Sequence, residues 1–256
     1  MDASADVCLA LTRDDLLAIE RAAVHAWPAS ETQNIAGWLW RYSGGGSQRA
    51  NSVSTLAFDG ADTIAAIEEA EELYFCRGAV SRFQVGTELA APADLDLQLE
   101  RRGYRLEEPV TTLARRLGQP SWPAGIEITA QPTAGWMEVY LSNIAPNRHA
   151  AAPAILDAVP APRAFLSYVS GGQVVSTALA VLHDHIVIAE CVGTRAEARR
   201  TGGARKVMAA LEAWGSARGA RIAALQAVAA NEPAQRFYAA LGYRKVNGYH
   251  YRVRDC

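Results

Sequence analysis

The stretch Arg199-Arg200-Thr201-Gly202-Gly203-Ala204 has the composition of an anion-binding loop at the start of a helix. Backbone N–H groups at a helix N-terminus have no partner within the helix, and the helix dipole favours negative charge there. Gly202 and Gly203 allow a phosphate to come close to the backbone, and Arg205 and Lys206 add positive charge. The sequence therefore predicts a pyrophosphate site, with a solvated basic turn as the alternative.

A second candidate group follows in Asn231-Glu232-Pro233-Ala234-Gln235-Arg236-Phe237-Tyr238. Asn231 can cap a helix and Pro233 suits its first turn, which places Tyr238 on a short helix. A phenol is neutral at pH 7 and can donate a proton to an atom on which negative charge develops. Tyr238 is therefore a candidate general acid; the alternative is an aromatic side chain at the edge of the core.

The two motifs together resemble the GNAT superfamily of acetyltransferases. Its Gln/Arg-x-x-Gly-x-Gly/Ala loop is similar to Arg199 through Ala204. Its Asn-x-x-Ala-x-x-Phe-Tyr-x-x-x-Gly-Phe/Tyr stretch is similar to the segment from Asn231 through Tyr238 and on to Leu241-Gly242-Tyr243. The joint resemblance covers roughly residues 126–254, and it implies an N-acetyltransferase.

The resemblance also implies a site and a mechanism. Acetyl-CoA would be the co-substrate, with its pyrophosphate on the loop and its pantetheine arm along the strand that ends in Cys191-Val192-Gly193-Thr194. The residues so implied for cofactor binding are Cys191, Val192, Gly193, Thr194, Arg199, Arg200, Thr201, Gly202, Gly203, Ala204, Arg205, Asn231 and Tyr238. An amine would attack the thioester directly while Tyr238 protonates the departing thiolate, and no metal is expected.

The base that takes the proton from the amine is less defined. Glu190 lies on the strand before the loop, near the place where some GNAT relatives carry a carboxylate. A carboxylate or a histidine could act through a water, and His183 and His185 lie at the start of the same strand. The alternative is that Glu190 pairs with a local cation and that the histidines lie on a rim.

Hydrophobic periodicity and turn residues locate the elements that must position these groups. Helices are expected over residues 14–27, 62–76, 93–102, 134–141, 150–158, 203–217 and 233–241. Strands are expected over residues 38–42, 49–53, 80–85, 110–114, 126–129, 164–169, 174–182, 185–192, 222–228 and 249–253. The first two strands would form a hairpin around Gly44-Gly45-Gly46.

Two prolines and two glycines between Gly118 and Gly125 predict a linker over 118–125, which separates a segment 1–117 from a segment 126–256. A shift of 139 positions lays the order helix, strand, helix, strand of one segment over that of the other. We expect an α/β fold of two tandem GNAT-like domains, each with a central mixed, mostly antiparallel sheet flanked by helices. Under this shift Asp62 stands in the phosphate loop and Leu99 replaces Tyr238, so the first domain is expected to have lost its cofactor site.

Four polar residues near the glycine-rich stretch have no place in cofactor chemistry: Arg41, Arg49, Asn51 and Ser52. They could face the active half from the first half. They could equally belong to a solvated hairpin with structural hydrogen bonds.

Bulk composition limits the function classes. The chain has 256 residues, a formal net charge of −2 and 50% hydrophobic residues, which weakens a nucleic-acid-binding reading. Neither a signal peptide nor a membrane span is indicated, and a membrane partner is not expected. The cysteines, Cys8, Cys76, Cys191 and Cys256, are far apart, which favours reduced thiols in a cytoplasm over disulfides or zinc.

Three functions remain open for this chain. The leading one is acetylation of a primary amine on a small molecule by a monomer or homodimer. A peptide or protein acetyltransferase is the second. A module that binds acyl-CoA without turnover is the third, although the presence of Asn231 and Tyr238 argues against it.

Overall fold

The structure of the chain is a computed structural model that describes residues 11–118 and 122–255. Residues 119–121 of the predicted linker lie outside the described residues, as do Cys8 and Cys256.

The helices in the described part are α1 Arg13–Ala26, α2 Thr63–Phe75, α3 Leu95–Arg101, α4 Ala134–Leu141, α5 Ala152–Ala158, α6 Gly203–Ser216 and α7 Glu232–Ala240. Its strands are β1 Glu31–Ile35, β2 Trp38–Tyr42, β3 Val53–Ser54, β4 Ser81–Gly86, β5 Arg105–Arg116, β6 Ile126–Thr129, β7 Arg163–Ser170, β8 Gln173–His183, β9 Ile186–Thr194, β10 Ile222–Val228 and β11 Arg244–Arg254. Short 3-10 helices are η1 Arg49–Asn51, η2 Pro146–Arg148 and η3 Ala196–Ala198.

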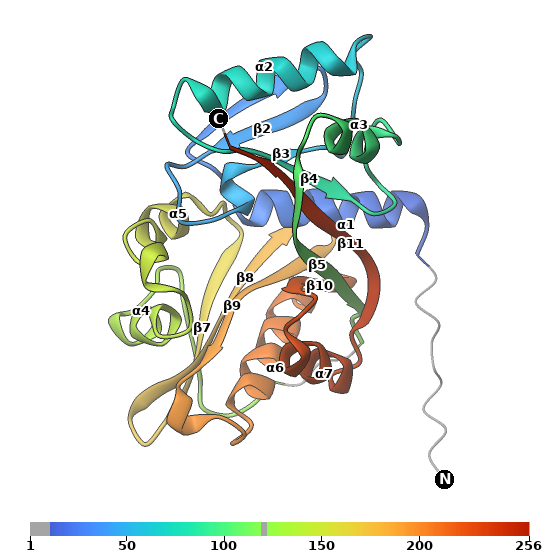
Figure 1. Ribbon diagram of the computed structural model, residues 1–256. Coiled ribbons are helices and arrows are strands. Elements are labelled where there is room, and N and C mark those ends of the chain that lie inside the picture. Colours follow the sequence, from blue (N-terminus) through green and yellow to red (C-terminus); the bar gives the residue numbers. More distant parts are fainter. Residues whose placement is uncertain (1–10, 119–121, 256) are drawn as a thin grey trace.

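All the strands join edge to edge into one sheet, in the order β1-β2-β3-β4-β11-β5-β10-β9-β8-β7-β6 (Figure 1). Only β3 with β4 and β9 with β10 run parallel, so the predicted mixed, mostly antiparallel α/β architecture is confirmed. The last strand of each half is exchanged. β5 from the first half lies between β10 and β11, and β11 from the second half pairs with β4.

The two halves repeat the same order of elements. β5 begins at Arg105 and β11 at Arg244, which is the offset of 139 residues found in the sequence. The starts of α2, β4 and α3 correspond to those of α6, β10 and α7 to within two residues of that offset. The repeat supports an internal duplication, and the proposed division into domains 1–117 and 126–256 stays a prediction because the halves share one sheet.

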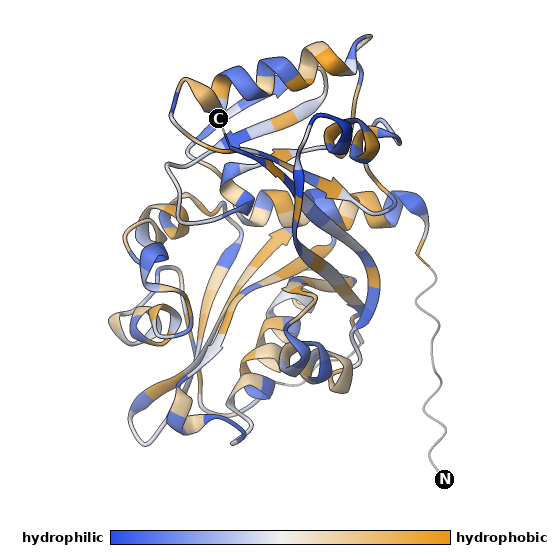
Figure 2. Ribbon diagram, viewed as in Figure 1, coloured by the Kyte–Doolittle hydropathy of each residue, from blue (hydrophilic) through white to orange (hydrophobic). Residues whose placement is uncertain are grey.

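Successive side chains of β9 point to opposite faces of the sheet, and both faces are buried in the core of the second half. Ile186 and Ile188 pack against α1, α4 and α5, and Val187 and Ala189 pack against α6 and α7. Figure 2 shows the corresponding hydrophobic strands between the two helical layers. α1 belongs to the first half but packs on β8, β9 and β10 of the second, so each half covers part of the other.

The predicted hairpin over residues 38–42 and 49–53 was wrong in its second strand. β2 does pair antiparallel with the next strand, at Leu39 and Ser54, but that strand is only β3 Val53–Ser54. The longer pairing of β2 is with β1, through a two-residue turn at Ala36 and Gly37, whose φ angles are 48° and 88°. Residues 49–51 form the 3-10 helix η1 because Asn51 folds the glycine loop back on itself. Its Oδ1 accepts from the N–H groups of Ser43 and Gly45, and its Nδ2 donates to the carbonyl of Ser47.

None of the helices in the ranges 11–118 and 122–255 has the length and apolar character to cross a membrane.

Candidate active site

A cleft opens where the two parallel strands β9 and β10 separate. They pair only from Ile186 to Ile188, opposite Ile222 to Ala224, although both strands continue beyond that point. β9 also carries a bulge, because Leu179 and Thr177 of β8 face Glu190 and Gly193. Cys191 and Val192 thus oppose a single residue, and Cys191 has φ 53°. A bulge leaves part of the hydrogen-bond ladder unpaired, so backbone groups here are available to a ligand.

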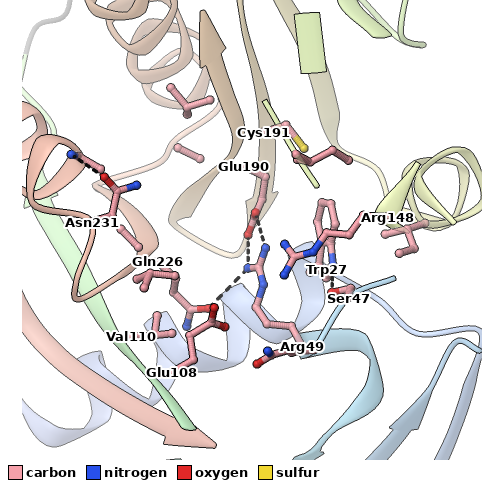
Figure 3. Close-up of a pocket in the computed structure, with 18 of the residues that line it drawn as sticks. Trp27, Ser47, Arg49, Glu108, Val110, Arg148, Glu190, Cys191, Gln226 and Asn231 are labelled. Atoms are coloured by element: carbon pink, nitrogen blue, oxygen red, sulfur yellow. Dashed lines mark hydrogen bonds and ion pairs between the residues drawn. The ribbon is translucent and has the colours of Figure 1, made fainter. Parts of the chain in front are cut away.

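A cavity of about 350 Å³ occupies this cleft, and both halves of the chain line it (Figure 3). The second half contributes Tyr140, Arg148, Glu190, Cys191, Val192, Gln226, Asn231 and Tyr238, among others. The first half contributes Trp27, the loop from Gly46 to Arg49, and Glu108 and Val110 of β5.

Glu190 forms a bidentate ion pair with Arg49 inside the cavity (Figure 3). Arg49 Nη1 lies 2.6 Å from Oε1, and Nη2 lies 2.7 Å from Oε2. Burial lowers the pKa of Arg49, but the charge and hydrogen bonds of Glu190 more than offset this and raise it. The Arg49 guanidinium also lies 4.9 Å from the Trp27 ring centroid, so it is held between a carboxylate and an aromatic face.

Gln226 connects this pair to a second, buried carboxyl group. Its Nε2 donates to Glu20 Oε2 at 2.8 Å, and its Oε1 accepts from Arg49 at 3.5 Å and Tyr249 at 3.4 Å. Glu20 also accepts from Thr112 and Asn247. Burial without a cation raises the pKa of Glu20, although these three hydrogen bonds lower it in part.

Tyr238 lines the cavity from α7 and is 8% exposed. Burial raises the pKa of its phenol, and the nearby charge of Glu190 adds to the effect. Its ring packs against Phe237 and Tyr243, and no described residue forms a hydrogen bond with its hydroxyl group. Tyr238 is thus a neutral phenol whose proton is not committed to another residue of the described chain.

The thiol of Cys191 also lines the cavity. Burial raises its pKa well above the usual range, and the negative charge of Glu190 contributes to that shift. A neutral thiol is a poor nucleophile, so the environment of Cys191 disfavours a covalent role.

The basic loop lies at the N-terminus of α6. Gly202 is the N-cap with φ 90°, and no side chain caps the first amides of the helix. A Cβ atom at Gly203 would collide with Ser176 Oγ, so the close packing of this turn requires glycine. Arg199, Arg200 and Arg205 are exposed, and none pairs with a described residue. Lys206 instead donates to the Tyr168 hydroxyl at 2.8 Å.

The structure brings several of the predicted site residues together. Glu190, Cys191, Val192, Asn231 and Tyr238 line the one cavity, while the loop from Arg199 to Arg205 lies outside its lining. Asn231 caps α7 by accepting from the Ala234 N–H, as its position in the sequence suggested. Their catalytic and binding roles remain predictions.

Other predicted residues lie elsewhere or serve the fold. Gly193 and Thr194 continue β9 beyond the bulge, and Thr194 Oγ1 lies 2.9 Å from Ser176 Oγ. His183 and His185 do not line the cavity; the ring of His183 packs on His25 at 4.3 Å. Arg41 is buried, with hydrogen bonds to Ser52 and Gln84.

Sequence reasoning left Arg49 undecided and missed Gln226, Trp27, Glu108 and Arg148. Arg49 and Glu190 lie 141 positions apart, and only the strand exchange and the packing of α1 bring them together. The one available signal was the cluster of polar residues around the glycine loop.

Comparisons with known proteins identify the family of the chain. The sequence profile of the family described as "Probable histone acetyltransferase Rv0428c C-terminal" matches residues 14–254. The "Uncharacterized N-acetyltransferase YobR" of Bacillus subtilis (strain 168) is 27% identical over 257 aligned residues, which cover 94% of this chain and 99% of the relative.

Solved structures show the same fold. A "GCN5-related N-acetyltransferase from Kribbella flavida" has a TM-score of 0.64 at 20% identity, over 93% of this chain and 91% of that one. A "Tandem GNAT protein from the clavulanic acid biosynthesis pathway" has a TM-score of 0.63 at 11% identity, over 95% of this chain and 96% of that one. The chain therefore belongs to the acetyltransferase family described as Rv0428c C-terminal, within the GNAT superfamily, whose acetyltransferases use acetyl-CoA.

Proposed function

We propose that this protein transfers the acetyl group of acetyl-CoA to a primary amine of a small molecule. The observation that carries the proposal is the cavity between β9 and β10, which brings a candidate acid and a candidate base together. Loops from both halves line the cavity, among them the glycine loop and the α4–α5 connection. A cavity of about 350 Å³ suits a small acceptor better than an extended chain.

The residues present fit acetyl-CoA. The N-terminus of α6 has no side-chain cap, and three unpaired arginines surround it, which suits a pyrophosphate. The bulge at Cys191 and Val192 offers backbone groups to a chain of amides along β9. When bound, acetyl-CoA supplies the acetyl group as an activated thioester.

Tyr238 would act as the general acid. Its side chain lines the cavity as a buried neutral phenol, and it keeps its proton at neutral pH because burial raises its pKa. Such a proton can pass to a sulfur atom as negative charge develops on it. Tyr238 then regains a proton from solvent.

Glu190 would take the proton released by the attacking amine, directly or through a water. In the described state both of its carboxylate oxygens accept from Arg49, so an ammonium or amine group must share or replace those bonds. Arg49, which belongs to the first half of the chain, therefore competes with the acceptor for the carboxylate of Glu190. The raised pKa of the Cys191 thiol supports direct attack by the amine over an acetylated enzyme.

A protein acceptor is the second candidate, because the matching family is described as a probable histone acetyltransferase. A basic peptide would have to bring its lysine past Arg49 and Arg148, which line the cavity. Like charges across an interface oppose binding, so this arrangement favours a small acceptor.

The test measures thiol release from acetyl-CoA with a panel of small amines and lysine-containing peptides. Turnover on small amines is expected, and Tyr238→Phe should lower kcat by about a hundredfold with little change in acetyl-CoA binding. Turnover on peptides alone would replace the proposal with the protein-acceptor alternative. Binding of acetyl-CoA without turnover of any acceptor would indicate a non-catalytic module.

A further inference from the structure

A second cavity, of about 490 Å³, adjoins the first. The two share the loop residues Gly46, Ser47 and Gln48 and the side chain of Arg148, so they meet at the glycine loop. Apart from Asn147, the rest of the second cavity is built from the first half, by β2, the end of α2, β4 and the loops next to them. Nothing in acetyl-CoA binding or proton transfer uses it.

The charged side chains that line this second cavity in the described part of the chain are all positive. Three arginines line it, Arg77, Arg82 and Arg148, and no aspartate or glutamate within 11–118 and 122–255 does. Arg77 is already paired, because its guanidinium lies 2.7 Å from Glu31 Oε2 and stacks on Trp40.

The other two arginines have no carboxylate partner. Arg82 donates from Nη1 to the carbonyl of Asn51 at 3.2 Å, and its Nε is buried without a partner among the described residues. The Arg148 side chain makes no hydrogen bond or ion pair with a described residue; only its backbone N–H is bonded, to the carbonyl of Ala145. The side chain extends from the α4–α5 connection toward the Arg49–Glu190 pair (Figure 3). Two guanidinium groups without a counter-charge favour an anion in the cavity that both line.

The first cavity, in contrast, contains a carboxylate that can receive an amine. Glu190 is the candidate group for the reacting amine, and its present partner is the guanidinium of Arg49. An acceptor with an amine at one end would place that end at Glu190. Its other end would then extend past Arg148 into the second cavity, because the two cavities meet there.

We propose that the acceptor is an amine that carries an anionic group, a carboxylate or a phosphate, at its far end. Arg82 and Arg148 bind that group in the second cavity. The inference rests on the proposed function, and it names the class of acceptor that Arg82 of the first half and Arg148 of the second half would select. Neutral or cationic amines leave the two arginines unpaired and are disfavoured for that reason.

The experiment compares acceptors that differ only at the far end. The panel consists of ω-amino acids of increasing chain length, each matched with the amino alcohol and the diamine of that length, and phosphoethanolamine matched with ethanolamine. For the wild type we expect kcat/KM of the best anionic member to exceed that of its neutral match by about tenfold or more, the usual size of a charge-assisted hydrogen bond. The phosphate and carboxylate arms identify which anion binds better.

Variants locate the effect at the arginines. Arg148→Gln should reduce the preference for the anion about tenfold through KM, because it removes one of the two charges that bind the anionic group. Arg148 is exposed, so its loss leaves the fold intact. Arg148→Glu should reverse the preference toward the diamine. Arg82→Gln should act like Arg148→Gln. Arg101→Gln, an exposed arginine of α3 without a partner among the described residues, is the matched control.

The inference would be overturned if kcat/KM were equal for anionic and neutral amines and Arg148→Glu did not alter it. The proposed function would still stand in that case, because the amines are acetylated. Failure of every small amine, with turnover of peptides, would overturn both.

Discussion

The Arg49–Glu190 pair yields the most quantitative prediction from the structure. Its two contacts are 2.6 and 2.7 Å long, and the side chains are 21% and 8% exposed. We compare Arg49→Gln, Glu190→Gln and the double variant. Each single change leaves one charge in the cavity without its partner, whereas the double change removes both charges together.

The expected magnitude follows from burial. Breaking a fully buried pair costs about 3–5 kcal/mol, and an exposed pair contributes about 0–1 kcal/mol. Because Arg49 keeps a fifth of its side chain exposed, each single variant should lower the free energy of unfolding by about 2–4 kcal/mol. The double variant should lie within about 1 kcal/mol of the wild type, since two neutral amides can hydrogen-bond to each other.

The assay is urea unfolding followed by the fluorescence of the six tryptophans, of which Trp27 lies beside Arg49. The matched control is Glu31→Gln, which removes a carboxylate from an ion pair of similar length, 2.7 Å, that is 30% and 50% exposed. That change should cost no more than about 1 kcal/mol. If Glu190→Gln costs as little as Glu31→Gln, or if the two single effects add in the double variant, the pair is not fixed as described.

Further predictions concern the loop, the buried acid and the thiol. Gly202→Glu should abolish acetyl-CoA binding by isothermal titration, because it adds bulk and negative charge at the α6 N-terminus; unchanged affinity would exclude the loop as the phosphate site. Burial raises the folded-state pKa of Glu20 above its ordinary value of 4.5. Its ionisation therefore costs no stability below about pH 4.5 and progressively more as pH rises toward the folded-state value. Glu20→Gln should remove this loss, so the variant gains stability relative to the wild type as pH rises above the ordinary carboxyl pKa of 4.5; parallel stability curves would contradict the shift. Because burial keeps the Cys191 thiol protonated, intact mass after mixing with acetyl-CoA alone should show no acetylated enzyme, and a stoichiometric adduct on Cys191 would refute direct attack.

Local signals were enough to locate most elements. Periodic apolar residues and caps predicted α2 from Asp62, whose carboxylate accepts from the N–H groups of Ile64 and Ala65. They also predicted α4 and β10 to the residue. Hydrophobic periodicity did not predict β1, because its residues Glu31 to Asn34 are polar and exposed at the edge of the sheet. A strand without a buried face leaves no alternation to detect.

The candidate site was only half predictable, for a physical reason. Tyr238, Asn231 and the basic loop belong to motifs whose residues are close in sequence, so spacing alone suggested them. Arg49 and Gln226 act through contacts that depend on tertiary structure. Arg49 reaches Glu190 only because η1 lies over the cleft, and no local pattern encodes a contact 141 residues away.

The strand exchange explains what the first half contributes without a cofactor loop of its own. The Asp62 carboxylate already occupies the first amides of α2, which leaves no place for a phosphate at the position that corresponds to the α6 loop. β5 nevertheless separates β10 from β11, and it carries Glu108 and Val110 into the cavity wall. α1 covers the β9 face opposite α6 and places Glu20 beneath Gln226, while η1 delivers Arg49 to Glu190. The first half is thus part of the wall of the candidate site, and under the proposal the charge that it places there contributes to the selection among amines.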